Sequence, residues 1–135
     1  MSRVFADAFF YIALLNRSDA AHPRAMEFMR RGADRVVTTA AVLLEVADAM
    51  SSPSRRAECA RFLGSLPVQA GTDIRQLDED LFARGRELYR SRPDKNWSLT
   101  DCMSFVVMAD EGLTESLTGD RHFEQAGFTA LLADR

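Results

Sequence analysis

The sequence predicts an α/β fold of three layers, α/β/α, in which helices cover both faces of a central, mostly parallel sheet of four to five strands. Two observations lead to this fold class. The chain has 135 residues, which is the length of a single domain. Short apolar runs alternate along it with longer segments of helical periodicity, and strands joined through such helices pair in parallel through right-handed crossovers.

The first part of the chain is predicted to form two strands and three helices. Residues 3–6 are an apolar run of strand length, and residues 8–16 stay apolar for long enough to form a buried helix. A second helix carries apolar residues at helical spacing and ends near Gly32. A second strand is predicted at residues 35–38, and residues 40–50 form a helix with one broad apolar face.

The middle of the chain begins with a helix break at residues 51–53, Ser-Ser-Pro. Residues 55–66 follow as an amphipathic helix, and the short run at residues 68–70 is predicted to be the third strand. Residues 74–89 carry an apolar stripe and are predicted to form a long helix. Residues 93–97 then form a polar loop.

The last part of the chain is predicted to return twice to the sheet. Residues 101–110 form a helix, and residues 113–117 form the next strand. Asp120 opens a short helix, and residues 127–132 form the final strand or a remnant of one.

Composition excludes several classes of protein. Apolar residues make up 47% and charged residues 27%, as in folded globular domains. The net charge of -3 argues against binding nucleic acid through bulk electrostatics, although it allows phosphate contact through a metal ion held by carboxylates. Cys59 and Cys102 lack the C-x-x-C pairing of a zinc site. With no apolar run near the roughly 18 residues that span a bilayer and no signal peptide, a soluble cytoplasmic protein is expected, with no membrane partner.

Four acidic residues are placed near the ends of predicted strands. Asp7 follows the first strand, Asp120 follows the strand at residues 113–117, and Asp101 opens the helix before that strand. Glu45 lies early in the helix after the second strand, among apolar neighbours. Each aspartate alone would also serve as a helix N-cap. As a set they are expected to converge, because ligands of parallel sheets gather at the carboxyl ends of the strands.

A cluster of four carboxylates favours a divalent cation. The charges repel one another in a low dielectric unless a cation neutralises them. Ligand sets of oxygen alone select hard ions, Mg²⁺ or Mn²⁺, over zinc. Such an ion lowers the pKa of bound water and stabilises phosphate oxygens during displacement. The cluster therefore points to hydrolysis of phosphodiester bonds.

These residues resemble the motifs of the PIN domain family of Mg²⁺-dependent ribonucleases, which includes the VapC toxins of bacterial toxin–antitoxin pairs. The resemblance spans nearly the whole chain and rests on four segments: Val4-Phe5-Ala6-Asp7 before an apolar helix, Thr38-Thr39-Ala40 leading to Leu44-Glu45-Val46, Ser98-Leu99-Thr100-Asp101-Cys102, and Leu117-Thr118-Gly119-Asp120-Arg121-His122-Phe123. It maps the acidic metal site, and with it the catalytic residues, to Asp7, Glu45, Asp101 and Asp120.

The resemblance also implies what the protein does. It implies a single PIN-like domain over residues 1–135 and an endoribonuclease that uses Mg²⁺ or Mn²⁺ to cleave tRNA, rRNA or mRNA. It further implies a homodimer and an antitoxin protein that holds the enzyme inactive. The chain departs from many relatives at Ala8, where they carry Thr or Ser, and at His122, where some carry a further acidic residue.

Four other polar side chains are expected to support the site from nearby. Thr118 would orient metal-bound water or, alternatively, bond to backbone at the strand end. Ser98 is expected to be a helix cap, and Ser104, one turn after Asp101, would hydrogen-bond to that carboxylate. His122, like His22, would act as a proton shuttle near neutral pH if it takes part at all.

Two other enzyme classes also carry an aspartate after the first strand of a parallel sheet, and a PIN fold could also lack catalytic activity. Haloacid dehalogenase-like phosphotransferases need a second Asp where this chain has Phe9, and receiver domains need a Lys after a late strand, whereas Lys95 lies in a loop. The remaining alternative is a PIN-fold module that binds RNA or a partner protein without cleaving. Metal-dependent cleavage of RNA would distinguish the two.

Overall fold

The computed structural model describes residues 2–134 and contains a sheet of five strands, all parallel, in the order β3-β2-β1-β4-β5. The predicted sheet is thus confirmed, with the first strand at its centre. The strands are β1 (Arg3–Ala6), β2 (Arg35–Thr39), β3 (Thr72–Arg75), β4 (Glu115–Leu117) and β5 (Thr129–Ala130).

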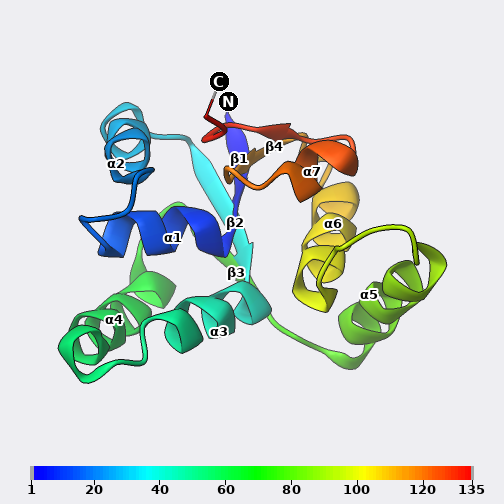
Figure 1. Cartoon of the computed structure of the whole chain (residues 1–135), viewed down its shortest axis with the longest axis horizontal. Coiled ribbons are helices and arrows are strands. Elements are labelled where there is room, and N and C mark those ends of the chain that lie inside the picture. The colour runs from blue at the N-terminus through cyan, green and yellow to red at the C-terminus, as the bar shows by residue number, and fades with distance from the viewer. Residues whose placement is uncertain (1, 135) are drawn as a thin grey trace.

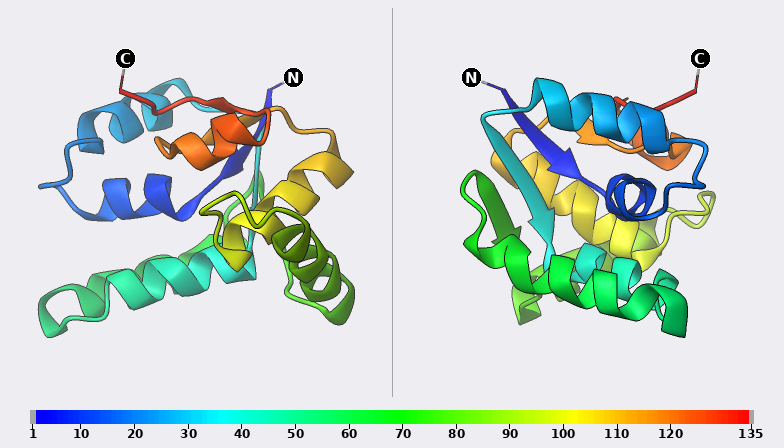
Figure 2. Two further views of the ribbon diagram at one scale, coloured as in Figure 1. Left: turned by 45° about the vertical axis from the view of Figure 1, so that its right-hand side comes forward. Right: turned by 90° about the vertical axis from the view of Figure 1, so that its left-hand side faces the viewer.

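Helices flank the sheet on both sides, with α1 and α2 on one side and α5, α6 and α7 on the other (Figure 1). Figure 2 shows α3 and α4 running together along one end of the molecule. The helices are α1 (Ala8–Leu15), α2 (His22–Arg31), α3 (Ala40–Ala49), α4 (Pro53–Ser65), α5 (Glu79–Ser91), α6 (Leu99–Glu111) and α7 (Arg121–Gln125), with a 3₁₀ turn at η1 (Leu66–Val68). Within residues 2–134, no helix combines the length and apolar character needed to cross a bilayer.

The core lies on both faces of β1. Val4, Phe5 and Ala6 are all buried, as expected of a central parallel strand covered by helices on both faces. On the α6 side, Phe105 packs edge-on against Phe123, with ring centroids 4.9 Å apart. This aromatic contact fixes α7 against α6 and so sets where the loop before α7 lies.

The third strand was predicted at the wrong residues. Residues 68–70 belong to a 3₁₀ turn and its exit, and Val68 is 85% exposed, whereas the strand begins after Gly71 at Thr72. Gly71 has a φ of 87°, which turns the chain into β3. β3 is an edge strand with no fully buried residue, so it lacks the apolar run that identifies a central strand.

The boundaries of two later elements also differ from the prediction. The long helix begins at Glu79 rather than at residue 74, because the Asp78 side chain accepts a hydrogen bond from the Leu81 amide and caps the helix there. The last strand was predicted at residues 127–132, but β5 pairs with β4 only over Thr129–Ala130. Both differences occur at the edges of the sheet, the first at the end of β3 and the second around β5.

Gly119 allows close packing between α1 and the loop after β4. A Cβ atom built on Gly119 would lie 2.5 Å from Cζ of Phe9, well inside van der Waals contact. The absence of a side chain therefore lets the Phe9 ring pack on the backbone one residue before Asp120. Gly64, near the end of α4, has open space around the same position.

The substitution Gly119→Ala should destabilise the fold by about 1–3 kcal/mol, because the Phe9 ring must move to admit the methyl group. Gly64→Ala is the matched control and should be neutral or stabilising by up to about 1 kcal/mol, since alanine is the better helix former. Urea denaturation of the two variants measures both effects. Equal stability of the two variants would contradict this account of the loop.

Candidate metal centre

The carboxyl ends of β1 and β4 lie side by side in the sheet. Ala6 at the end of β1 is in register with Leu117 at the end of β4. From this point β1 continues into α1 and β4 continues toward α7, on opposite sides of the sheet (Figure 1). This is a topological switch point, where open parallel sheets bind their ligands. Asp7 follows β1 directly, and Asp120 is the N-cap of α7.

Thr118 joins these two aspartates. Its hydroxyl donates a hydrogen bond to Oδ2 of Asp7 at 2.8 Å and accepts one from the backbone N–H of Asp120 at 3.0 Å. Thr118 is fully buried, and Asp7 is 7% exposed. The hydroxyl therefore fixes the Asp7 carboxylate relative to the loop that carries Asp120. The Thr118 hydroxyl thus hydrogen-bonds both to the side chain of Asp7 and to the backbone of Asp120.

The first turn of α6 brings the third aspartate to the same place. The Ser98 hydroxyl accepts a hydrogen bond from the Asp101 amide at 2.9 Å, and Oδ2 of Asp101 accepts one from the Ser98 amide at 3.1 Å. This reciprocal capping box starts the helix and orients the carboxylate at once. Ser98 is therefore the helix cap that the sequence predicted, and it positions Asp101 through that role.

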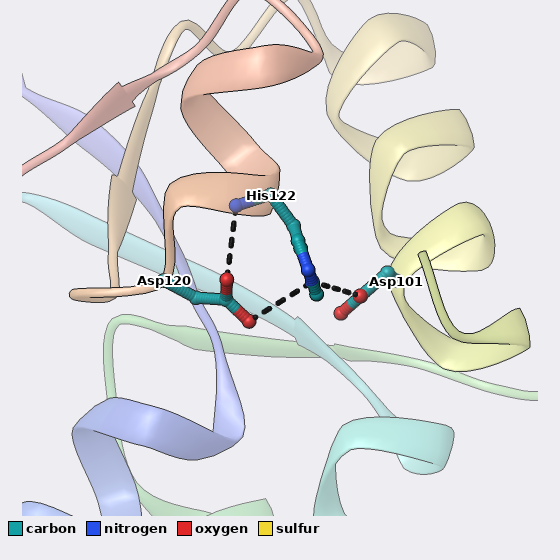
Figure 3. A group of neighbouring side chains, drawn as sticks. All are labelled: Asp101, Asp120 and His122. Carbon is teal, nitrogen blue, oxygen red and sulfur yellow. Dashed lines mark hydrogen bonds and ion pairs between the residues drawn. The ribbon is translucent and has the colours of Figure 1, made fainter. Parts of the chain in front are cut away.

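His122 lies between two of the carboxylates (Figure 3). Its Nδ1 is 3.1 Å from Oδ2 of Asp101 and 3.3 Å from Oδ2 of Asp120. Its backbone N–H donates to Oδ1 of Asp120 at 2.9 Å. Asp101, Asp120 and His122 each offer one ligand atom, and these atoms lie within 4.8 Å of one another. Asp101 and Asp120 were expected here, but sequence reasoning gave His122 a peripheral place.

Glu45 is coupled electrostatically to the three aspartates. It lies on α3, whose start is fixed by the Thr39 hydroxyl accepting a hydrogen bond from the Val42 amide at 3.0 Å. Glu45 is half-buried, and the charges of Asp7, Asp101 and Asp120 all act on it. All four predicted carboxylates are thus electrostatically coupled, although the tightest group is the one that contains His122.

Two other residues, Ser104 and His22, make contacts that differ from those considered for them from the sequence. Ser104 does not hydrogen-bond to Asp101. Its Oγ is buried and, among the described residues, has no hydrogen-bond partner, because one helical turn places it inside the core rather than at the helix start. His22 hydrogen-bonds through Nδ1 to the backbone oxygen of Ala13 at 2.7 Å, which ties α2 to α1.

Burial makes the ionised form of these carboxylates costly. Desolvation raises the pKa of Asp7 to about 6, although the Thr118 hydrogen bond opposes the shift, and the charge of Asp101 adds to it. Desolvation, followed by the charges of Asp7 and Asp101, raises the pKa of Glu45 to about 7. Desolvation also raises the pKa of Asp101, against the Ser98 hydrogen bond. A cation at this place would relieve all three shifts.

The donor atoms fit a divalent cation. Three aspartates converge on one edge of the sheet, and two of them offer oxygens within 4.8 Å of each other and of an imidazole nitrogen. Carboxylate oxygens are the ligands that Mg²⁺ and Mn²⁺ prefer. Asp7, Asp101 and Asp120 would hold such an ion, with Glu45 beside it.

The model of the PIN domain family matches residues 4–129 of the chain. The chain belongs to the PIN domain family. The match includes every carboxylate of the cluster, so this PIN domain has its acidic residues within the shared part of the fold. Among curated proteins, none matches this PIN domain at a significant level.

Solved structures share the fold over almost the whole chain. The VapC20 toxin of Mycobacterium tuberculosis, which cleaves the sarcin–ricin loop, superposes with a TM-score of 0.85 at 24% identity, covering 94% of this chain and 96% of that one. FitAcB of Neisseria gonorrhoeae gives 0.68 at 17% identity, covering 94% of each chain. VapBC2 of Rickettsia felis, bound to a DNA fragment from its promoter, gives 0.66 at 11% identity, covering 96% of this chain and 97% of that one.

The raised pKa of Asp7 predicts how the stability of the metal-free protein depends on pH. The folded chain holds a proton on Asp7 up to a pH of about 6, whereas aspartate has a pKa near 3.8 without the fold. Stability is therefore lost as the pH rises through this window. Asp7→Asn should be more stable than the wild type at pH 8 in EDTA by an amount on the order of 2–3 kcal/mol, and this difference should vanish below about pH 4.

Urea denaturation at several pH values measures this difference. Asp80→Asn, at an exposed position on α5, is the control and should leave the pH dependence of the wild type unchanged. A gain for Asp7→Asn that stays constant from pH 4 to pH 8 would contradict the electrostatic origin of the effect.

Proposed function

We propose that this chain, residues 1–135, acts as a single PIN domain that hydrolyses RNA phosphodiester bonds with the help of Mg²⁺ or Mn²⁺, as the toxin of a VapBC-type pair. The observation that carries the proposal is the convergence of Asp7, Asp101 and Asp120 at the switch point, with Glu45 coupled to all three. The raised pKa values of Asp7, Asp101 and Glu45 favour a site for a cation over helix capping alone.

The residues of the site have different roles in the proposed reaction. A divalent ion, when bound, neutralises the scissile phosphate and makes a coordinated water more acidic. Glu45 would accept the proton of the attacking water, because its carboxylate is coupled to all three aspartates but is not one of the three closest ligand atoms. Thr118 and the Ser98 cap hold Asp7 and Asp101 in position. Attack by water on phosphorus, with the P–O3′ bond breaking and the 3′-oxygen taking up a proton as it leaves, gives a 5′-phosphate and a 3′-hydroxyl.

We also propose an antitoxin protein as a partner, a homodimer as the functional unit and the cytoplasm as the place of action. The support comes from the PIN family and from neighbours of the same fold, among them VapC20, a toxin that cleaves the sarcin–ricin loop, and VapBC2. Exposed apolar side chains on two helices offer surface for protein contacts, Met26 and Met29 on α2 and Phe82 and Tyr89 on α5.

Cleavage of RNA tests the catalytic proposal. The purified protein should cut a mixed pool of tRNA, rRNA and mRNA in Mg²⁺ or Mn²⁺, lose the activity in EDTA, and leave 5′-phosphate and 3′-hydroxyl ends. Asp7→Asn and Asp120→Asn should each lower the rate at least about a hundredfold, because they remove ligand charge while keeping side-chain shape. Asp80→Asn is the surface control and should cleave like the wild type.

The same assay separates this function from the alternative. Cleavage that survives EDTA, or products with 2′,3′-cyclic phosphate ends, would indicate attack by the 2′-hydroxyl and would overturn the proposed mechanism. RNA binding that the two aspartate variants share with the wild type, without cleavage by any of them, would identify a non-catalytic binding module.

Metal binding should also stabilise the folded protein. An ion that binds only the folded state at a hundredfold excess over its Kd contributes about 2.7 kcal/mol. Thermal melts should therefore shift upward in saturating Mg²⁺ or Mn²⁺ for the wild type and shift less for Asp101→Asn. The same upward shift in both proteins would place the stabilising ion elsewhere.

A further inference from the structure

We propose that His122 is itself a ligand of the ion, through Nδ1, and that this nitrogen makes the centre prefer Mn²⁺ to Mg²⁺. The inference rests on the proposed function only in requiring that a divalent ion binds at these carboxylates. It goes further by assigning a fifth side chain to the centre and by naming the metal. The assignment of His122 can fail while the nuclease function stands, because metal preference and nitrogen coupling are measured separately from cleavage.

The imidazole of His122 lies against two carboxylates of the centre. Nδ1 lies 3.1 Å from Oδ2 of Asp101 and 3.3 Å from Oδ2 of Asp120 (Figure 3). The three ligand atoms span at most 4.8 Å. This is close to the separation of two ligands on opposite sides of one ion, about 4–5 Å for bond lengths of 2.0–2.5 Å. An ion among the three atoms would therefore need only a small adjustment of the side chains.

The Nδ1 atom of His122 has more carboxylate neighbours than it can serve with full hydrogen bonds. Nδ1 carries at most one proton, so it can donate one full hydrogen bond, yet it lies beside two carboxylate oxygens. A helix cap or a simple ion pair does not need both contacts. Three ligand atoms that converge on one point are what an ion requires.

The backbone around His122 holds this residue in place. Its amide donates to Oδ1 of Asp120, so the residue that supplies one ligand also anchors the other. Phe123, the next residue, is fully buried against Phe5 and Phe105. The His122 side chain is 24% exposed, which leaves the ring little freedom to move away from the centre. The imidazole is therefore presented to the ion by a rigid support.

A nitrogen ligand changes which ion binds best. Mg²⁺ prefers a complete set of oxygen ligands, whereas imidazole suits transition metals, and Mn²⁺ accepts both carboxylates and imidazole. A set of aspartates with one histidine should therefore gain affinity for Mn²⁺ without a similar gain for Mg²⁺. An aspartate at this position would give Mg²⁺ the all-oxygen set it prefers.

The test uses the metals alone and measures binding. Free Mn²⁺ is followed by electron paramagnetic resonance, and Mg²⁺ by calorimetry, for the wild type, His122→Ala, His122→Asp and His22→Ala. His122→Ala should weaken Mn²⁺ binding at least about tenfold and Mg²⁺ binding less than about threefold. His122→Asp should bind Mg²⁺ more tightly relative to Mn²⁺ than the wild type does. His22→Ala is the matched control, because His22 is the only other histidine, and it should bind both ions like the wild type.

Pulsed electron paramagnetic resonance provides a signature that a merely structural histidine would not give. Mn²⁺ bound to the wild type and to His22→Ala should show coupling to a directly bonded ¹⁴N nucleus, and this coupling should be lost in His122→Ala and in His122→Asp. Mn²⁺ that binds the wild type without nitrogen coupling would overturn the role of His122 while leaving the carboxylate centre and the nuclease intact. No binding of either ion to the wild type would overturn the proposed function as well.

Discussion

Buried carboxylates that repel one another are the constraint on which the rest of this structure depends. Asp7 and Asp101 are each 7% exposed, and their charges act on each other as well as on Glu45. Nothing in folding alone favours bringing such groups together. The protein holds them in place with polar contacts that each satisfy a backbone group at the same time, namely the Thr118 bridge and the capping box of Ser98.

The buried carboxylates destabilise the metal-free protein, whereas they favour the state with a bound cation. Desolvation makes the carboxylates harder to ionise, and the same low dielectric strengthens their attraction for a cation. The Nδ1 atom of His122 lies within reach of both Asp101 and Asp120, at the point where a cation would contact the two carboxylates. The core beneath supplies the stability that the site gives up, through the buried strand β1 and the aromatic contacts of Phe105.

Central elements of the fold were predictable from sequence, because burial on both faces leaves a clear apolar run. Val4, Phe5 and Ala6 mark β1, and Asp7 follows at the edge where ligands gather. The edge strand β3 was not predictable in this way. Its half-exposed sequence gives no apolar run, and the signals that define it, Gly71 before it and the Asp78 cap after it, concern its neighbours.

For the site, sequence could place the acidic residues at strand ends but could not give distances between them. The contact of His122 with Asp101 joins residues 21 positions apart and depends on how α7 packs against α6. Ser104 shows the opposite error, since helical spacing suggested a contact with Asp101 that the burial of its side chain prevents. Positions within one element follow from periodicity, whereas contacts between elements follow from packing.

A crystal structure of the protein grown in saturating Mn²⁺ tests the central claim most directly, because anomalous scattering locates the ion without assumptions about activity. The account predicts a manganese peak at the carboxyl ends of β1 and β4, with oxygens of Asp7, Asp101 and Asp120 within about 2.0–2.6 Å. Manganese bound only at other carboxylates on the surface, with these three aspartates free of it, would contradict the account.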